Sequence, residues 1–224
     1  MEIKYNLEKI KNLIPSHVQL IAVSKTKPEI DILEAYNSGQ RVFGENKAQE
    51  MAGKYQNLPK DIQWHFIGHL QTNKIKYISP FVTLIHSVDS AKLLLSIDKE
   101  AKRNNRIIDC LLQFYIATEE SKFGFDLEEA KALLNSDTYK YMNNIRIAGV
   151  MGMATYTENE QLIRNEFKQL AEIFRELKNN YFNNTNSFKE ISMGMSDDYQ
   201  IAIEEGSSML RIGSSIFGDR NYKI

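Results

Sequence analysis

Eight short apolar runs alternate with segments of helical periodicity along nearly the whole chain, and this alternation most constrains the fold. The runs predict strands, and apolar residues spaced three and four apart predict helices. Because parallel strands need crossover connections, the alternation indicates an α/β protein with a parallel sheet. Eight units predict a single closed (β/α)8 (TIM) barrel, with an extra N-terminal helix over residues 3–14. The predicted strands are 20–23, 41–43, 63–67, 82–85, 107–116, 145–150, 190–193 and 209–212. Between them we also predict a helix at 71–77, a capping box of Asp126 and Glu129 at the start of a later helix, and a polar loop at 179–186.

An open, doubly wound sheet is the alternative architecture for such a pattern. It is disfavoured because no G-x-G-x-x-G motif follows the first predicted strand. No linker-like change in composition interrupts the alternation either, so we expect one domain spanning residues 1–224.

Bulk composition excludes several classes of partner. The 224 residues include 28 basic and 29 acidic side chains, so no excess of positive charge favours nucleic acid or an anionic membrane surface. The single cysteine, Cys110, excludes an internal disulfide and lies in an apolar run, where a buried thiol in a reducing compartment is expected. The sequence has neither a signal-peptide pattern nor an apolar stretch of membrane-spanning length, so we expect a cytoplasmic protein.

The first predicted strand leads directly to a lysine. Residues 20–23 (LIAV) are all apolar, Lys25 follows, and Pro28 suits the first turn of the next helix. Burial at a strand end would lower the pKa of the Lys25 ammonium from ~10.4 and leave some free amine able to attack an aldehyde. The alternative is an ordinary lysine whose ammonium reaches out to water.

Small or polar residues follow nearly every predicted strand. In a (β/α)8 barrel the loops after the strands meet at one end, and ligand sites lie there. We therefore expect the site at this end. The residues concerned are Lys25, Asn46, His69, Ser87, Met153, Ser196, Gly213 and Ser214.

The last two strand ends indicate an anion site. The predicted N-cap Ser196 opens a helix, and the turn at 211–215 (RIGSS) has small residues whose amides can approach an anion. Barrels often bind phosphate with the loops after strands seven and eight. The alternative is plain helix capping, which Asp197 and Asp198 favour because carboxylates already complement the helix dipole there.

Arg211 lies between two apolar residues of the last predicted strand, so its guanidinium needs a buried partner. That partner is either a carboxylate on a neighbouring strand or an acceptor atom of a ligand, such as an aromatic ring nitrogen. His65 and His69 are four residues apart but flank a strand end. Neither a Glu-x-x-His motif nor a cysteine pair accompanies them, so we predict structural histidines and no metal site.

Short motifs run in order from residue 22 to residue 218. They are AVSKTKP (22–28), FGEN (43–46), WHFIGHLQ (64–71) with Asn73 and Lys74, HSVD (86–89), EESKFG (119–124), GVM (149–151), MGMSDD (193–198) and RIGSSIFG (211–218). Each motif is weak alone, but the set is specific. Together they resemble the pyridoxal phosphate homeostasis protein family, and the resemblance covers almost the whole chain.

The resemblance implies a barrel like the N-terminal domain of alanine racemase (PLP fold type III), with pyridoxal 5′-phosphate (PLP) as cofactor. It implies that Lys25 carries PLP as a Schiff base and that Arg211 faces the pyridine nitrogen. Two departures are mild: Ser208 or Ser214 stands where family members often have threonine, and residues 152–156 are less typical. The remaining implied contacts are Ser196, Gly213 and Ser214 to the phosphate, and Asn46 and Met153 to the ring.

The resemblance leaves the question of catalysis to the rest of the sequence. An arginine at the ring nitrogen weakens the electron sink, although racemases tolerate it. The chain ends soon after its last predicted strand, without the second domain from which alanine racemases build a two-base site. We therefore expect a monomeric PLP-binding homeostasis protein without robust catalysis, with PLP-accepting apo-enzymes as candidate partners. The alternatives are a PLP-dependent amino acid racemase in a minimal barrel and a PLP-free Schiff-base lyase.

Overall fold

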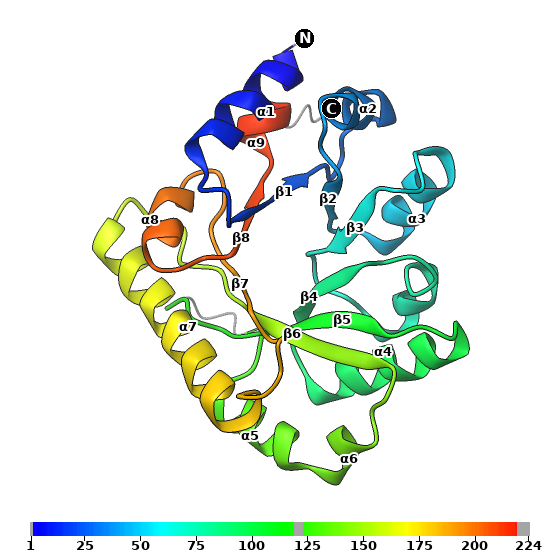
Figure 1. Ribbon diagram of the computed structural model, residues 1–224, viewed down its shortest axis with the longest axis vertical. Helices are drawn as coiled ribbons and strands as arrows, with labels where there is room; N and C mark the ends of the chain where they lie inside the picture. Colours follow the sequence, from blue (N-terminus) through cyan, green and yellow to red (C-terminus); the bar gives the residue numbers. More distant parts are fainter. Residues whose placement is uncertain (1, 119–122, 219–224) are drawn as a thin grey trace.

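The computed structural model describes residues 2–118 and 123–218, so residues 119–122 of the EESKFG motif lie outside the described residues. Eight parallel strands pair in sequence order, and β8 pairs with β1 to close the barrel (Figure 1). The predicted barrel is confirmed, and the open-sheet alternative is wrong. The strands are β1 (Gln19–Val23), β2 (Val42–Glu45), β3 (Gln63–Phe66), β4 (Leu84–Val88), β5 (Ile108–Gln113), β6 (Ile145–Met151), β7 (Glu190–Ser192) and β8 (Met209–Ile212).

Helices surround the barrel and connect its strands (Figure 1). The predicted N-terminal helix is α1, which packs beside α9. None of the helices within the described ranges combines the length and the apolar character needed to cross a membrane. The helices are α1 (Glu2–Leu13), α2 (Glu29–Asn37), α3 (Ala48–Asn57), the 3-10 helix η1 (Thr72–Tyr77), α4 (Ala91–Arg103), α5 (Leu127–Asn135), α6 (Asp137–Lys140), α7 (Glu160–Tyr181), α8 (Tyr199–Glu204) and α9 (Ser214–Phe217).

Two separate apolar clusters hold the fold together. The larger lies between strands and helices, and the smaller fills the inside of the barrel. Arg211 follows the inner-cluster residue Met209 by two positions on β8, so its side chain points to the same face. The barrel interior therefore changes from apolar to polar toward its carboxyl end. The inner cluster consists of Ile21, Val42, Leu84, Leu111, Ala148, Met151 and Met209.

Several predicted boundaries need correction. The predicted fifth strand (107–116) is longer than β5, and its first residue, Ile107, is 62% exposed because it precedes the barrel wall. The predicted helix at 71–77 is the 3-10 helix η1. Helix α7 continues to Tyr181 and so includes the first residues of the predicted loop at 179–186. The predicted capping box of Asp126 and Glu129 is present at the start of α5.

Candidate functional site at the carboxyl end of the barrel

The predicted site residues lie at or next to the carboxyl ends of strands. Lys25 and Asn46 follow β1 and β2, which are neighbours in the barrel. Because all strands are parallel, their carboxyl ends lie on one side of the molecule. The structure therefore places these residues around one end of the barrel. The others are Met153 after β6, Ser196 between β7 and α8, Arg211 within β8, and Gly213 and Ser214 at the start of α9.

Lys25 is half-buried in a tight turn after β1. The Lys27 amide donates to the Ser24 carbonyl (3.1 Å), which closes the turn around Lys25 and Thr26. Thr26 has a φ of +64°, the left-handed conformation that the third residue of a type II turn requires. Farther along, the Lys27 ammonium donates to the carbonyls of Phe217 (2.8 Å) and Gly218 (3.0 Å), so the second lysine of the motif ties this turn to the end of α9.

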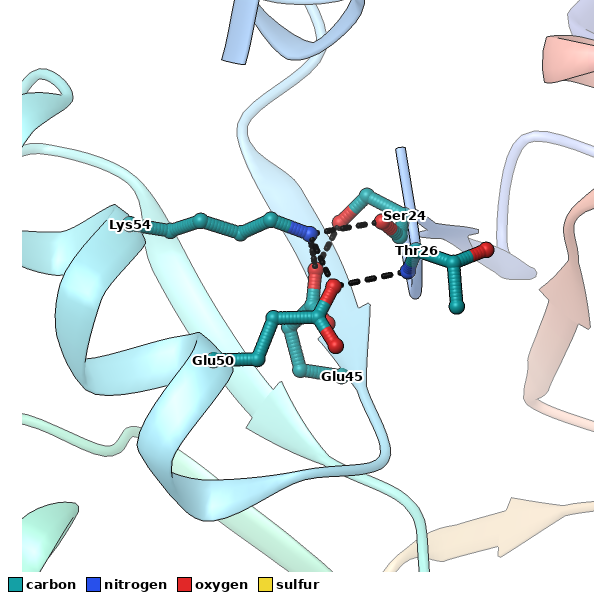
Figure 2. A network of polar contacts seen from close by, with 5 residues as sticks. All are labelled: Ser24, Thr26, Glu45, Glu50 and Lys54. Carbon is teal, nitrogen blue, oxygen red and sulfur yellow. Dashed lines mark hydrogen bonds and ion pairs between the residues drawn. The ribbon is translucent and has the colours of Figure 1, made fainter. Parts of the chain in front are cut away.

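A polar network supports this turn from the side of α3; Ser24, Glu45 and Lys54 are buried in it, and the contact of Glu50 with Thr26 lies at its exposed edge (Figure 2). The buried ammonium of Lys54 donates to Glu45 Oε1 (2.8 Å), Glu50 Oε1 (2.7 Å) and the Ser24 carbonyl (2.8 Å). The Ser24 hydroxyl donates to Glu45 Oε1 (2.6 Å), and the Thr26 amide donates to Glu50 Oε1 (2.7 Å). Burial raises the pKa of the Glu45 carboxyl, against the opposing effect of the Lys54 charge.

Ser196 does not cap α8 as predicted, because the N-cap residue is Asp198. The Ser196 hydroxyl accepts instead from the Gly213 amide at 3.4 Å, a long hydrogen bond that joins the loops after β7 and β8. A side chain at Gly213 would crowd Val23 of β1, with its Cβ 3.2 Å from the Val23 carbonyl oxygen. The small-residue turn is therefore packed closely against the strand that leads to Lys25.

The aspartates near Ser196 play different parts. The Asp198 carboxylate accepts from the Met195 amide (2.6 Å), and its burial raises the pKa of that carboxyl. Asp197 is exposed. The Asp198 carboxylate is thus bound within its own loop. The alternative in which Asp197 and Asp198 leave Ser196 only a helix-capping role therefore loses part of its support.

Arg211 is buried. Its hydrogen bonds go to a hydroxyl and a carbonyl, and not to the carboxylate on a neighbouring strand that was one of the two expected partners. Its Nη1 donates to Ser192 Oγ (2.6 Å) and its Nη2 to the Gly152 carbonyl (3.0 Å). Burial lowers the pKa of the guanidinium to about 10, against the attraction of Asp198. The guanidinium stays charged at neutral pH.

Two buried histidines continue the chain of hydrogen bonds from Arg211. His86 Nδ1 lies 2.8 Å from Ser192 Oγ, and His86 Nε2 lies 3.0 Å from His65 Nδ1. Because Arg211 can only donate, the Ser192 hydroxyl donates to His86 Nδ1, and His86 Nε2–H then donates to His65. Both rings are neutral, since burial lowers the pKa of His65 to about 3 and that of His86 well below its usual value.

Asn46 and Met153 differ in environment. Asn46 is half-buried, and its Oδ1 is a buried acceptor for which the described residues supply no donor. Met153 is 42% exposed. Asn46 therefore has an unused hydrogen-bonding capacity at the barrel end, whereas Met153 contributes an apolar side chain open to solvent.

The two histidines singled out in the sequence have separate partners. His65 pairs with His86, while the exposed His69 has its Nδ1 3.1 Å from Asp89 Oδ2. No group of three potential metal ligands occurs within residues 2–118 and 123–218. Ser87 lies inside β4, where its hydroxyl donates to the Gly68 carbonyl, and does not follow the strand as predicted.

Sequence reasoning missed three residues that organise this end of the barrel: Lys54, Glu45 and Ser192. Lys54 follows Met51 by three positions, so a lysine on the buried face of α3 was a usable signal. Glu45 was a second usable signal, because a carboxylate in an apolar strand needs a buried partner. The sequence carries no signal for the contact of Ser192 with His86, because β4 and β7 are not neighbours in the barrel.

Comparison with known proteins gives a consistent result. The family described as "Alanine racemase, N-terminal domain" matches residues 1–221. The pyridoxal phosphate homeostasis protein of Aquifex aeolicus is 41% identical over 205 residues, which is 91% of this chain and 88% of that protein. The protein of the same name from Haemophilus influenzae is 36% identical over 238 residues, covering 99% of this chain and 98% of that one.

Solved structures agree with the sequence relatives. PipY of Synechococcus elongatus, in its structure with PLP bound, has a TM-score of 0.86 and 34% identity over 96% of this chain and 100% of that chain. An alanine racemase of Clostridium difficile has a TM-score of 0.71 at 14% identity, over 99% of this chain and 57% of that enzyme, and shares the fold. The motifs, the barrel and these relatives lead to one conclusion: the chain belongs to the pyridoxal phosphate homeostasis protein family, whose barrel is that of the alanine racemase N-terminal domain.

Proposed function

We propose that this protein binds PLP through Lys25 at the carboxyl end of the barrel and acts in PLP homeostasis without robust catalysis. The observation that carries the proposal is the position of Lys25, half-buried at the end of β1, the strand that packs against Gly213. The relatives named for PLP homeostasis and the PLP-bound structure of PipY support it.

The residues at the barrel end fit PLP in their chemistry. Ser196, Gly213 and Ser214 offer a hydroxyl and backbone amides of the kind that bind phosphate, and the first amides of α9 have no partner within the helix. Arg211 presents a buried cation, and its Nη1 and Nη2 already donate to Ser192 and Gly152, which fixes the guanidinium in place. An aromatic ring nitrogen suits this group as a further acceptor. The unmatched Oδ1 of Asn46 suits a donor on the ring, and Met153 supplies apolar contact.

When bound, PLP supplies an aldehyde that an amine can convert to a Schiff base and a ring that withdraws electrons. The residues of this chain would hold it: Lys25 through its side-chain nitrogen, and the loops after β7 and β8 through hydrogen bonds. Because Arg211 stays charged at neutral pH, it would donate a hydrogen bond to the ring nitrogen without protonating it. A ring held in this way would supply a weaker electron sink, which favours binding over carbanion chemistry.

Absorption spectroscopy with borohydride trapping tests the proposal. Protein incubated with PLP is expected to show a Schiff-base band, and reduction followed by peptide mass mapping is expected to place the adduct on Lys25. Lys25→Ala should lose band and adduct. Lys99→Ala, at an exposed lysine of α4, is the matched control and should leave both intact. A reduced adduct on another lysine contradicts the assignment.

Exchange of the α-hydrogen tests the absence of robust catalysis. Amino acids deuterated at the α-carbon are expected to keep their label in the presence of the PLP-loaded protein. Sustained loss of deuterium would instead support a racemase in a minimal barrel.

We further propose that the protein acts as a monomer in the cytoplasm and passes PLP to apo-enzymes. The buried, reduced Cys110 is consistent with that compartment.

A further inference from the structure

We propose that Glu50, acting with Lys54 and Glu45, is a positioning residue for Lys25. The three side chains, of which Lys54 and Glu45 are buried and Glu50 is half-buried, form the polar network beside the turn after β1 (Figure 2). This inference rests on the proposed function, in which Lys25 carries PLP, and deepens it by naming what aims the Lys25 side chain.

The network holds the peptide groups on both sides of Lys25. The carbonyl of Ser24 belongs to the peptide that precedes Lys25, and it accepts from Lys54 Nζ at 2.8 Å. The amide of Thr26 belongs to the peptide that follows Lys25, and it donates to Glu50 Oε1 at 2.7 Å. Because the two peptide planes around a Cα define its φ and ψ, these contacts fix the direction in which the Lys25 side chain leaves the backbone.

The turn needs this support because its conformation is strained. Thr26 is β-branched and has a φ of +64°, a region that such residues avoid. Residues held in this region cost roughly 1–3 kcal/mol and persist where the surroundings over-determine them. The contact of Glu50 with the Thr26 amide is one such constraint. A relaxed turn would rotate the Lys25 side chain away from its present direction.

Stability alone is a weak reason for burying this ion pair. Lys54 and Glu45 are both buried, and Glu45 Oε2 has no hydrogen-bond partner among the described residues. Buried pairs are often no more stabilising than apolar side chains of similar volume, since desolvation offsets their attraction. The Lys54 ammonium donates to three acceptors, and so it fixes the Ser24 carbonyl, Glu45 and Glu50 relative to one another. Positioning of Lys25 explains why this ion pair is buried, although packing does not require it.

The test separates the covalent step from the rest of PLP binding. Schiff-base formation joins the Lys25 nitrogen to the aldehyde carbon as C=N and releases one water. Its rate is measured by the growth of the absorption band, with the adduct mapped after borohydride reduction. Pyridoxine 5′-phosphate has an alcohol in place of the aldehyde, so its affinity reports the remaining contacts without the Lys25 bond. The melting temperature of the PLP-free protein reports folding.

Variants of α3 supply the comparison. Glu50→Ala removes the acceptor of the Thr26 amide and is expected to slow Schiff-base formation about tenfold, with unchanged affinity for pyridoxine 5′-phosphate. Glu50→Gln keeps an acceptor oxygen and should restore most of the rate. Gln49→Ala, at an exposed neighbouring position on α3, is the matched control. Should Glu50→Ala fail to fold, Glu50→Asp withdraws the carboxylate by one methylene and carries the same comparison.

Each outcome decides between defined possibilities. Slow Schiff-base formation in Glu50→Ala with rescue by Glu50→Gln supports positioning. A wild-type rate in Glu50→Ala overturns it. Equal losses of rate and of pyridoxine 5′-phosphate affinity also overturn it, because they indicate a general distortion of the site. If the wild-type protein forms no adduct on Lys25, the proposed function fails, and this inference fails with it.

Discussion

Arg211 donates from Nη1 to Ser192 Oγ at 2.6 Å inside the barrel, and this contact joins the charged guanidinium to two neutral histidines. The hydroxyl accepts from Arg211 and donates to His86, so it uses both of its hydrogen-bonding roles at once. The contact therefore connects β8 and β7 to β4 across the polar end of the barrel interior.

Ser192→Ala is expected to destabilise the protein strongly. The change leaves a buried guanidinium N–H and a buried imidazole nitrogen without partners, which should lower the free energy of unfolding by about 3 kcal/mol. Urea denaturation measures the change. The control is Ser96→Ala on the outer side of α4, whose hydroxyl donates only to the Lys92 carbonyl and whose loss should cost within about 0.5 kcal/mol. Equal effects of the two changes would mean that the interior chain contributes little.

The buried histidines predict a loss of stability in acid. The folded pKa of His65 is about 3, whereas the unfolded chain titrates near the ordinary value of 6.5, because burial disfavours the charged ring. A basic group with a lowered folded pKa binds more protons when unfolded. Its contribution is complete above pH ~6.5 and falls by up to about 1.4 kcal/mol per pH unit as the pH drops toward 3.

Urea titrations at a series of pH values between 7 and 4 check this expectation. His65→Gln removes one titrating ring and keeps a side-chain acceptor for His86, so its unfolding free energy should depend less steeply on pH. An identical pH slope in the variant and the wild type would show that other groups control acid stability.

Ser196→Ala is expected to weaken PLP binding more than folding. The hydroxyl joins the loops after β7 and β8 and does not cap α8, so its loss should leave α8 intact. Loss of one hydrogen bond to a charged phosphate should raise the dissociation constant of PLP about tenfold. Ser90→Ala provides the contrast, because Ser90 does cap α4, and its loss should cost about 1 kcal/mol of stability with unchanged PLP affinity. Unchanged PLP affinity in Ser196→Ala would remove Ser196 from the site.

Thr26→Gly is expected to stabilise the folded protein. Glycine adopts a φ of +64° without a side-chain clash, and the gain should be about 1 kcal/mol in the free energy of unfolding. Asn105 has a φ of +52°, and asparagine tolerates this region, so Asn105→Gly should gain less. Thermal unfolding of the PLP-free variants measures both changes. A loss of stability in Thr26→Gly would show that the threonine side chain outweighs the strain.

The amino-acid sequence by itself determined the barrel and the end of it at which the candidate site residues gather. Strand–helix alternation leads to parallel strands, and parallel strands bring Lys25, Asn46 and Gly213 to one end whatever the details of packing. Local signals were equally reliable where the contact is local, as in the capping box of Asp126 and Glu129. Periodicity was less informative about helix type and helix ends. The predicted helix at 71–77 is a 3-10 helix, and the N-cap of α8 is Asp198 where we predicted Ser196.

Tertiary structure alone decided which polar groups meet inside the barrel. Lys54 reaches the turn after β1 from a helix 30 residues away, and Ser192 meets His86 over 106 residues of sequence. Such contacts depend on the closure of the barrel and on the direction of each side chain, and neither leaves a periodic trace in the sequence. The physical reason is that buried polar groups must find partners in space, and the fold determines which partners are within reach.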